Sequence, residues 1–261
     1  MSVPDRSFWF DTALARLPDG LVRDVRVGVH WTAVVVETDG RLACGLAATQ
    51  MPAEHEGPTV ADAGQLIQRT GLDLAGLIRS SSPTEASIGL AAINALLPPG
   101  PTTWGNVNAG ELLAEYGAGK HVAVVGHFPF VDDLRERVGV LSVLELYPRP
   151  GDLPASAAAA VVPEADVLAI TATTLLNHTF DGLMALRRPD ALVMLLGPST
   201  PLTPLLFDYG VDLLSGAIVE DVDAVLAAVS QGAGFRKIHR AGVRLVTPVS
   251  YTHLRAHETV L

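Results

Sequence analysis

The sequence is poor in cysteine and in lysine. Among its 261 residues Cys44 is the single cysteine, so an internal disulfide and a CxxC metal site are both excluded. Lys120 and Lys237 are the only lysines, which leaves little room for a Schiff-base lysine. A chain without structural disulfides is typical of a reducing compartment, and we therefore expect a cytoplasmic protein.

Long apolar runs and basic clusters are missing as well. No stretch reaches the about 20 apolar residues that a membrane helix needs, so we expect no membrane partner. The first residues, Met1 to Asp11, lack the apolar core of a secretion signal. The net charge is −10 without a basic stripe, which argues against nucleic acid as a partner.

The first half of the chain has the pattern of a small α+β domain. Hydrophobic residues make up 49% of the sequence, enough for one large or two medium domains. Strands are expected at 25–30, 31–38 and 41–47, with a hairpin turn at Asp39-Gly40. Helices are expected at 11–17, 59–68, 72–79 and 84–97. The last of these is apolar nearly all round, which predicts a buried helix.

The second half alternates short apolar strands with helices. Strands are expected at 122–125, 141–146, 167–171, 192–196 and 211–214. Helices are expected at 109–115, 131–138, 155–161, 175–186, 201–207 and 222–229. This alternation predicts an α/β fold with a parallel sheet that helices cover on both faces. Right-handed crossovers then place every loop that follows a strand at one edge of the sheet.

A proline-rich stretch at 98–101 is the best linker in the chain. We predict an N-terminal domain at 1–100 and a second domain at 101–248. The segment 249–261 has no periodic apolar face and resembles a translated cloning adapter. We therefore leave it out of the fold prediction.

Five loops are expected at the carboxyl edge of the parallel sheet, where open α/β sheets bind their ligands. They are 126–130, 145–152, 171–177, 197–201 and 215–219. In one of them Ser199 or Thr200 could cap a helix and leave backbone N–H groups for an anion. In another, Thr173, Thr174 and Asn177 could hold a phosphate, a carboxylate or a metal-bound water. Helix capping alone is the alternative interpretation of both loops.

Charged and buried polar residues add further candidates. His127 directly follows a strand and could be a base, a hydrogen-bond donor or a metal ligand. Arg149 lies between two prolines and could pair with a ligand carboxylate, or with Asp152 or Glu145. In the first domain, Glu85 opens the buried helix. Asn94 lies inside it and needs a hydrogen-bond partner, which the backbone could supply.

Several catalytic and nucleotide-binding motifs do not occur. The strand at 122–125 is followed by GHFP instead of GxGxxG, which weakens a dinucleotide-binding interpretation. The sequence has no Walker lysine loop, HExxH motif, calcium loop or GxSxG elbow. Glu145 nevertheless lies near the position of the acid that binds ribose in dinucleotide-binding folds.

The quoted segments resemble a known family. The matching runs are 126–130 (GHFPF), 145–152 (ELYPRPGD), 165–167 (ADV), 171–177 (TATTLLN) and 197–201 (GPSTP). Together they resemble the family described as "Putative heavy-metal chelation". The run 83–95 (PTEASIGLAAINA) looks like the companion domain that often precedes it. The resemblance covers about Asp11 to Val246. It implies a Rossmann-like second domain, an N-terminal domain like that of enolase, and a site between the two.

The resemblance also implies a set of site residues. His127 and Glu145 are the candidate metal ligands, for a divalent or heavy-metal ion. The candidate ligand-binding residues are Glu85, Asn94, Arg149, Asp152, Thr173, Thr174, Asn177, Ser199 and Thr200.

Three functions stay open at this point. The first is binding of a small anion or metal chelate, with a homo-oligomer as one assembly state. The second is an enzyme acting on a small anionic metabolite, with His127 as general acid or base. The third is a nucleotide-binding redox protein. Whether the protein is catalytic is left open.

Overall fold

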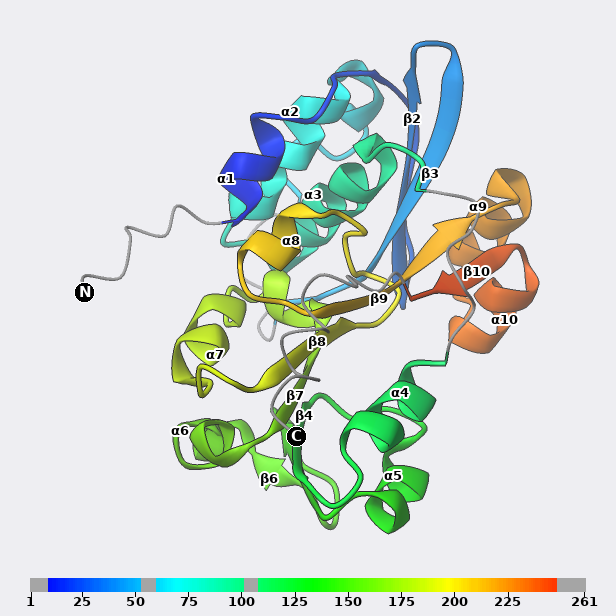
Figure 1. Ribbon diagram of the computed structural model, residues 1–261. Coiled ribbons are helices and arrows are strands. Elements are labelled where there is room, and N and C mark those ends of the chain that lie inside the picture. Colours follow the sequence, from blue (N-terminus) through cyan, green and yellow to red (C-terminus); the bar gives the residue numbers. More distant parts are fainter. Residues whose placement is uncertain (1–8, 53–59, 101–107, 248–261) are drawn as a thin grey trace. The chain divides into compact units, whose positions relative to one another are not determined.

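The computed structural model describes residues 9–52, 60–100 and 108–247 (Figure 1). These residues form two compact units. The first unit takes Met1–Thr102, Pro198–Leu205 and Gly216–Leu245, and the second takes Thr103–Gly197, Leu206–Ser215 and Val246–Leu261. The predicted linker lies partly, and the predicted adapter-like segment wholly, outside the described residues. In the described part of the chain, no helix is long and apolar enough to cross a membrane.

The first unit contains a three-stranded antiparallel sheet in the order β1-β2-β3. Its strands are β1 (Leu21–Val27), β2 (Trp31–Thr38) and β3 (Arg41–Ala48). Asp39 and Gly40 have φ angles of 52° and 75° and form the tight turn that their sequence predicts. Helix α1 (Trp9–Leu14) precedes the sheet. The smaller N-terminal α+β region is therefore confirmed.

Helix α3 (Pro83–Leu96) packs closely against this sheet. A Cβ atom on Gly45 of β3 would lie 2.0 Å from the carbonyl oxygen of Ala91, so glycine alone allows this approach. The predicted burial of this helix is confirmed, because Ile88, Leu90 and Ile93 are all fully buried. The short elements before it are η1 (Leu66–Gln68), α2 (Gly71–Ala75) and η2 (Gly76–Arg79).

Two C-terminal helices pack on the other face of the small sheet. They are α9 (Val222–Ser230) and α10 (Phe235–Arg240), coloured orange in Figure 1. Val225, Val229 and Ile238 of these helices form one buried cluster with Ala33 and Leu46 of the sheet. The first unit therefore closes its core with segments from both ends of the chain.

The large sheet has seven strands in the order β10-β9-β8-β7-β4-β5-β6. In chain order they are β4 (His121–Val125), β5 (Val140–Glu145), β6 (Leu153–Pro154), β7 (Val167–Thr171), β8 (Leu192–Leu196), β9 (Leu213–Val219) and β10 (Val243–Val246). The pairings from β9 through to β6 are all parallel. The strand order reverses between β4 and β7, and such a switch point leaves a crevice at the carboxyl ends of the strands.

Both faces of the sheet in the second unit are buried. Val122 and Val124 of β4 join the cluster that contains Leu113 and Leu134 of the flanking helices. Ala123 points to the opposite face and is equally buried. The helices are α4 (Ala109–Tyr116), α5 (Val131–Arg137), α6 (Ala158–Val161), α7 (Phe180–Leu186) and α8 (Leu205–Asp208). The predicted α/β class with a parallel sheet covered on both faces is thus confirmed.

Several predicted boundaries were wrong. The helix expected at 175–186 is a 3-10 turn, η5 (Ala172–Leu175), followed by α7. The helix expected at 201–207 begins only at Leu205, because Pro201 and Pro204 interrupt it. Residues 215–219, expected in a loop, continue strand β9. The 3-10 turns η3 (Ala155–Ala157) and η4 (Val162–Glu164) flank α6, where one helix was expected.

Candidate functional site

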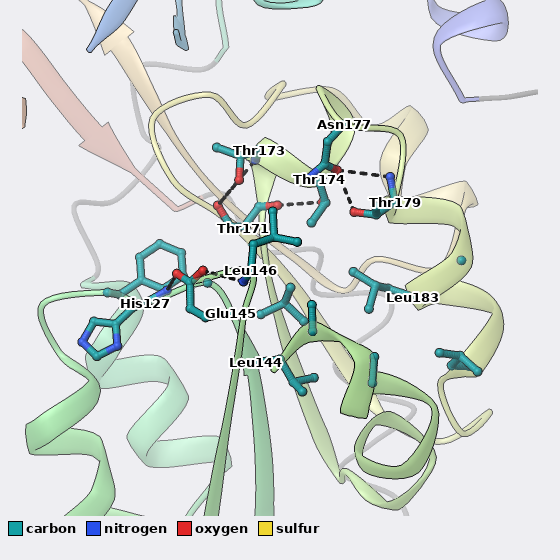
Figure 2. A pocket seen from close by; sticks show the side chains of 17 residues that line it. His127, Leu144, Glu145, Leu146, Thr171, Thr173, Thr174, Asn177, Thr179 and Leu183 are labelled. Atoms are coloured by element: carbon teal, nitrogen blue, oxygen red, sulfur yellow. Dashed lines mark hydrogen bonds between the residues drawn. The ribbon is translucent and has the colours of Figure 1, made fainter. Parts of the chain in front are cut away.

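A pocket of about 520 Å³ lies at the carboxyl ends of β4, β5 and β7, within the second unit (Figure 2). It is lined by Val125, Gly126, His127, Phe128, Leu144, Glu145, Leu146, Ala155, Ala158, Thr171, Thr173, Thr174, Asn177, Thr179, Gly182, Leu183 and Leu186. Its volume is in the range of about 300–1,000 Å³ that is typical of small-molecule sites.

Fold topology explains why the pocket lies here. The strands β4 and β7 are hydrogen-bonded neighbours, but the connections that follow them lead in opposite directions across the sheet. Gly126, at the end of β4, has a φ of 101°, and a Cβ atom there would lie 3.0 Å from the Thr171 Cβ. A glycine at this position lets the chain turn sharply without filling the crevice.

Glu145 is the charged residue of the pocket lining. It is the last residue of β5, and its carboxylate accepts hydrogen bonds from two backbone amides. The His127 N–H donates to Oε1 at 2.7 Å, and the Leu146 N–H donates to Oε2 at 3.0 Å. Each oxygen keeps a further lone pair, so the carboxylate is both fixed in place and still able to accept a donor from a ligand.

His127 is held by a buried carboxylate. Its Nδ1 lies 2.9 Å from Oδ2 of Asp152, whose side chain is 0% exposed. The carboxylate accepts this hydrogen bond, so Nδ1 carries a proton and donates it to Asp152. In Figure 2 the imidazole lies on the outer side of Glu145, away from Leu144 and Leu183. His127 is therefore a residue of the rim whose ring is oriented by Asp152.

Asp152 is kept in its ionised form. Burial raises the pKa of this carboxyl, but hydrogen bonds from the Arg149 N–H and from His127 lower it, and the net pKa lies below its ordinary value. Arg135 adds to this effect, with a guanidinium nitrogen 3.6 Å from Oδ1. The carboxylate thus orients His127, and its buried position removes it from direct ligand contact.

Hydroxyl and amide groups line the opposite side of the pocket. The Thr171 hydroxyl caps η5 and lies 3.0 Å from the Thr173 hydroxyl. The Thr174 hydroxyl donates instead to the Thr171 carbonyl at 2.7 Å, and this hydrogen bond stabilises the turn. The Asn177 side-chain oxygen accepts from the Thr179 N–H and hydroxyl, which leaves its NH₂ group as a donor.

The pocket lining favours a particular class of ligand. It is mostly apolar, carries the Glu145 carboxylate and includes no lysine or arginine. A small anion would meet a negative charge without a compensating cation. The small anionic ligand that the sequence predicts stays a prediction, and the lining offers no lysine or arginine to pair with it.

Five of the predicted site residues line this pocket. They are His127, Glu145, Thr173, Thr174 and Asn177. Asp152 lies behind His127. Arg149 is exposed and contributes its backbone N–H to Asp152, so the cation nearest this carboxylate among the described residues is Arg135. The structure thus brings together the loops after β4, β5 and β7.

The four other predicted site residues belong to the first unit. Glu85 accepts hydrogen bonds from the Ala61 N–H and the Ser80 hydroxyl, so it ties two local segments to the start of α3. The Asn94 amide donates to the carbonyls of Leu46 and Ser199. The bonds of Asn94 to backbone carbonyls fit the structural role that the sequence analysis gave as its alternative.

Ser199 and Thr200 do not cap a helix. The Ser199 hydroxyl accepts from the Ala48 N–H at 2.8 Å, and the helix expected to follow begins only at Leu205. Thr200 is buried, and its hydroxyl has no hydrogen-bond partner among the described residues. The predicted helix-start anion site is therefore absent from this loop, because the tertiary packing of 198–205 replaces the helix turn.

Sequence reasoning missed some pocket residues. Thr171 opens the predicted loop 171–177 but was not named as a candidate, Thr179 lies beyond the loop, and Gly182 and Leu183 line the pocket from α7. Thr171 ends the parallel strand β7, which pairs with β4, so it lies at the same edge of the sheet as His127. Its position at a strand end could have marked it as a candidate site residue. Arg135 gave no signal, because its contact with Asp152 joins helix α5 to the loop before β6.

The described side chains do not form a metal centre. No group of three or more His, Cys, Asp and Glu residues is placed to hold a metal ion in the described ranges. Each Glu145 oxygen accepts one backbone N–H and keeps a lone pair, and the one thiol, Cys44, lies in the first unit. The predicted metal ligands His127 and Glu145 both line the pocket, and their role as ligands stays a prediction.

Known proteins share this fold over nearly the whole chain. A crystal structure of a protein with unknown function from the DUF364 family of Desulfitobacterium hafniense has 31% sequence identity and a TM-score of 0.75. The alignment covers 92% of this chain and 96% of that one. A DUF364 protein of unknown function from Pyrococcus horikoshii has 21% identity and a TM-score of 0.75, over 93% and 98% of the two chains. The latter likeness concerns the fold alone.

Sequence comparisons agree with the structural ones. The uncharacterized protein MJ0500 of Methanocaldococcus jannaschii is 27% identical over 80% of this chain and 82% of its own length. Residues 10–97 match the DUF4213 family, and residues 108–247 match the DUF364 family; both are described as "Putative heavy-metal chelation". The chain therefore belongs to the DUF364 family, with a DUF4213 region before it.

Proposed function

We propose that this protein binds a small neutral or cationic organic molecule in the pocket at the carboxyl ends of β4, β5 and β7. One observation carries the proposal: the pocket is mostly apolar, lies at the switch point of a parallel sheet, and presents a carboxylate with no lysine or arginine in its lining. The family description names heavy-metal chelation. The described residues support an organic ligand better than a metal held by protein side chains alone.

Native mass spectrometry of the purified protein tests this proposal. We expect a small organic molecule to co-purify in substoichiometric or stoichiometric amount, and to be released on denaturation. The same measurement detects any bound metal ion. When nothing co-purifies, a fluorescence-based thermal shift screen of neutral and cationic metabolites replaces it, and stabilisation is expected for at least one compound.

Substituting Gly182 provides a control at the site. This glycine lines the pocket from α7, and a Cβ atom there would meet nothing within 4 Å. Gly182→Leu is therefore expected to add a side chain to the pocket wall without a clash at Cβ, and to weaken ligand binding. Gly76→Leu, at a glycine with equally open surroundings in the first unit, is the matched control and should bind normally. Equal binding by both variants would place the ligand elsewhere.

A catalytic function in the same pocket is the second candidate. The hydrogen bond from His127 Nδ1 to Asp152 favours it, because this arrangement orients an imidazole whose Nε2 can accept a proton. Once a ligand is known, its turnover by wild type and by His127→Gln decides the matter. Binding without turnover in wild type would exclude catalysis of that compound.

A further inference from the structure

The carboxylate of Glu145 presents two adjacent acceptors to the pocket. Each of its oxygens receives one backbone N–H, at 2.7 Å from His127 and at 3.0 Å from Leu146. A carboxylate oxygen accepts about two hydrogen bonds, so one lone pair on each oxygen remains. Two neighbouring hydroxyl groups of a ligand match this arrangement, since each can donate to one oxygen.

The place of Glu145 in the fold favours a sugar. It ends β5, the strand that follows β4 in sequence and pairs with it. In doubly wound sheets, an acid about 20 residues beyond the first glycine of the turn binds the ribose hydroxyls. Gly126 is that first glycine here, with its positive φ and its close approach to Thr171. Both the position of Glu145 in the fold and the two acceptors of its carboxylate therefore favour a ribose as the ligand group.

An apolar surface suitable for a flat base adjoins this carboxylate. Leu144 and Leu146 flank Glu145 along the chain, and Ala158 and Leu183 line the same pocket from α6 and α7. Figure 2 shows Leu144 and Leu183 beside the cavity, and the hydroxyl and amide groups of Thr173 and Asn177 across it. Such walls bury a heteroaromatic ring, and the polar groups can pair with its edge.

The pocket and the turn after β4 offer no comparable binding site for a phosphate group. The turn after β4 contains Pro129, which has no backbone N–H to donate. Helix α5 begins without a side-chain cap and carries Asp132 and Asp133 in its first turn, which repel an anion. No lysine or arginine lines the pocket. The turn therefore lacks the features by which dinucleotide-binding folds hold a pyrophosphate.

From these observations we infer that the ligand is a ribonucleoside without phosphate, held by its vicinal ribose hydroxyls on Glu145. The inference rests on the proposed function of the pocket and names the chemical class of its ligand. It differs from dinucleotide binding because the same site would disfavour the phosphorylated forms.

Isothermal titration calorimetry on the full-length protein tests the inference. The probes are adenosine, guanosine, cytidine and uridine, with the 2′-deoxynucleoside and the 5′-monophosphate of each. We expect at least one ribonucleoside to bind, its 2′-deoxy analogue to bind about tenfold or more weakly, and its 5′-monophosphate to bind no more tightly. Equal affinity for ribo- and deoxynucleoside, or tighter binding of the monophosphate, would overturn the inference.

Variants refine the test. Glu145→Gln should lose most of the preference for ribose over deoxyribose, because an amide offers one acceptor in place of two. Asp133→Asn, at an exposed side chain of α5, is the control and should keep the wild-type preference. The comparison of ribo- and deoxynucleoside on wild type stands even when Glu145→Gln fails to fold.

The outcomes separate this inference from the proposed function. A different organic molecule that co-purifies with wild type and is absent from Gly182→Leu would support the pocket and overturn the nucleoside. A ribonucleoside that binds wild type and Gly182→Leu equally would overturn both, since the pocket would not be its site.

Discussion

The buried carboxylate of Asp152 allows a quantitative prediction about stability. Its side chain is 0% exposed and accepts hydrogen bonds from the Arg149 N–H at 3.1 Å and from His127 Nδ1 at 2.9 Å. A hydrogen bond to a charged group contributes about 1.5–3 kcal/mol. Asp152→Ala loses both bonds and the charge that faces His127 and Arg135, so we expect the free energy of unfolding to fall by about 3 kcal/mol.

The conservative variant and a surface variant calibrate this value. Asp152→Asn keeps one acceptor oxygen and should lose about 1–2 kcal/mol. Asp133 pairs with Arg137 one helical turn away, but its side chain is 66% exposed. Asp133→Asn should therefore lose no more than about 0.5 kcal/mol. Urea denaturation at pH 7, followed by circular dichroism, measures all three values.

The pH dependence follows from the lowered pKa of Asp152. A carboxyl group with a pKa below its ordinary value of 3.8 stabilises the fold above that pH. Its contribution is lost as the pH falls through the lower pKa of the folded state. The difference in unfolding free energy between wild type and Asp152→Asn should therefore shrink below about pH 4. A loss under 0.5 kcal/mol for Asp152→Ala at pH 7, equal to that of Asp133→Asn, would refute the reasoning.

Other parts of the structure give further predictions. Burial raises the pKa of the Cys44 thiol to about 12, so iodoacetamide at pH 8 should modify the folded protein far more slowly than the urea-unfolded one. Gly182→Ala should stabilise α7 by about 0.5–1 kcal/mol, because the site is helical and open. Gly126→Ala should destabilise by about 1 kcal/mol or more, because φ is 101° there; thermal unfolding compares the two. Ser199→Ala leaves the Ala48 N–H unpaired and should cost about 1–3 kcal/mol in urea denaturation.

Much of the fold was predictable because its strands are apolar and short. The runs at 122–125, 167–171 and 192–196 are buried on both faces, and such runs stand out in a sequence. The elements that were missed carry little signal. Strand β6 has two residues, and Ile238 is the buried residue of the charged helix α10. A periodicity needs several turns or alternations before it can be recognised.

The candidate site was predictable only where topology determines it. His127, Glu145 and Thr173 follow parallel strands, and parallel strands end at one edge of a sheet. Ser199 follows β8 in the same way, yet its loop belongs to the first unit, where Ser199 accepts the Ala48 N–H. Local sequence cannot distinguish these cases, because the deciding contact joins residues far apart in the chain. The ion pair of Arg135 with Asp152 escaped the sequence for the same reason.

The small antiparallel sheet depends on residues encoded more than a hundred positions later. Ala33 and Leu46 pack with Val225, Val229 and Ile238, so the first unit cannot be expressed intact from the first hundred residues. A truncation at the DUF4213 boundary would leave one face of that sheet without its cover, and such an exposed apolar face promotes aggregation. Recombination that exchanged only the DUF4213 region or only the DUF364 region would separate the small sheet from the helices that cover it. The two regions are therefore expected to be inherited as a pair.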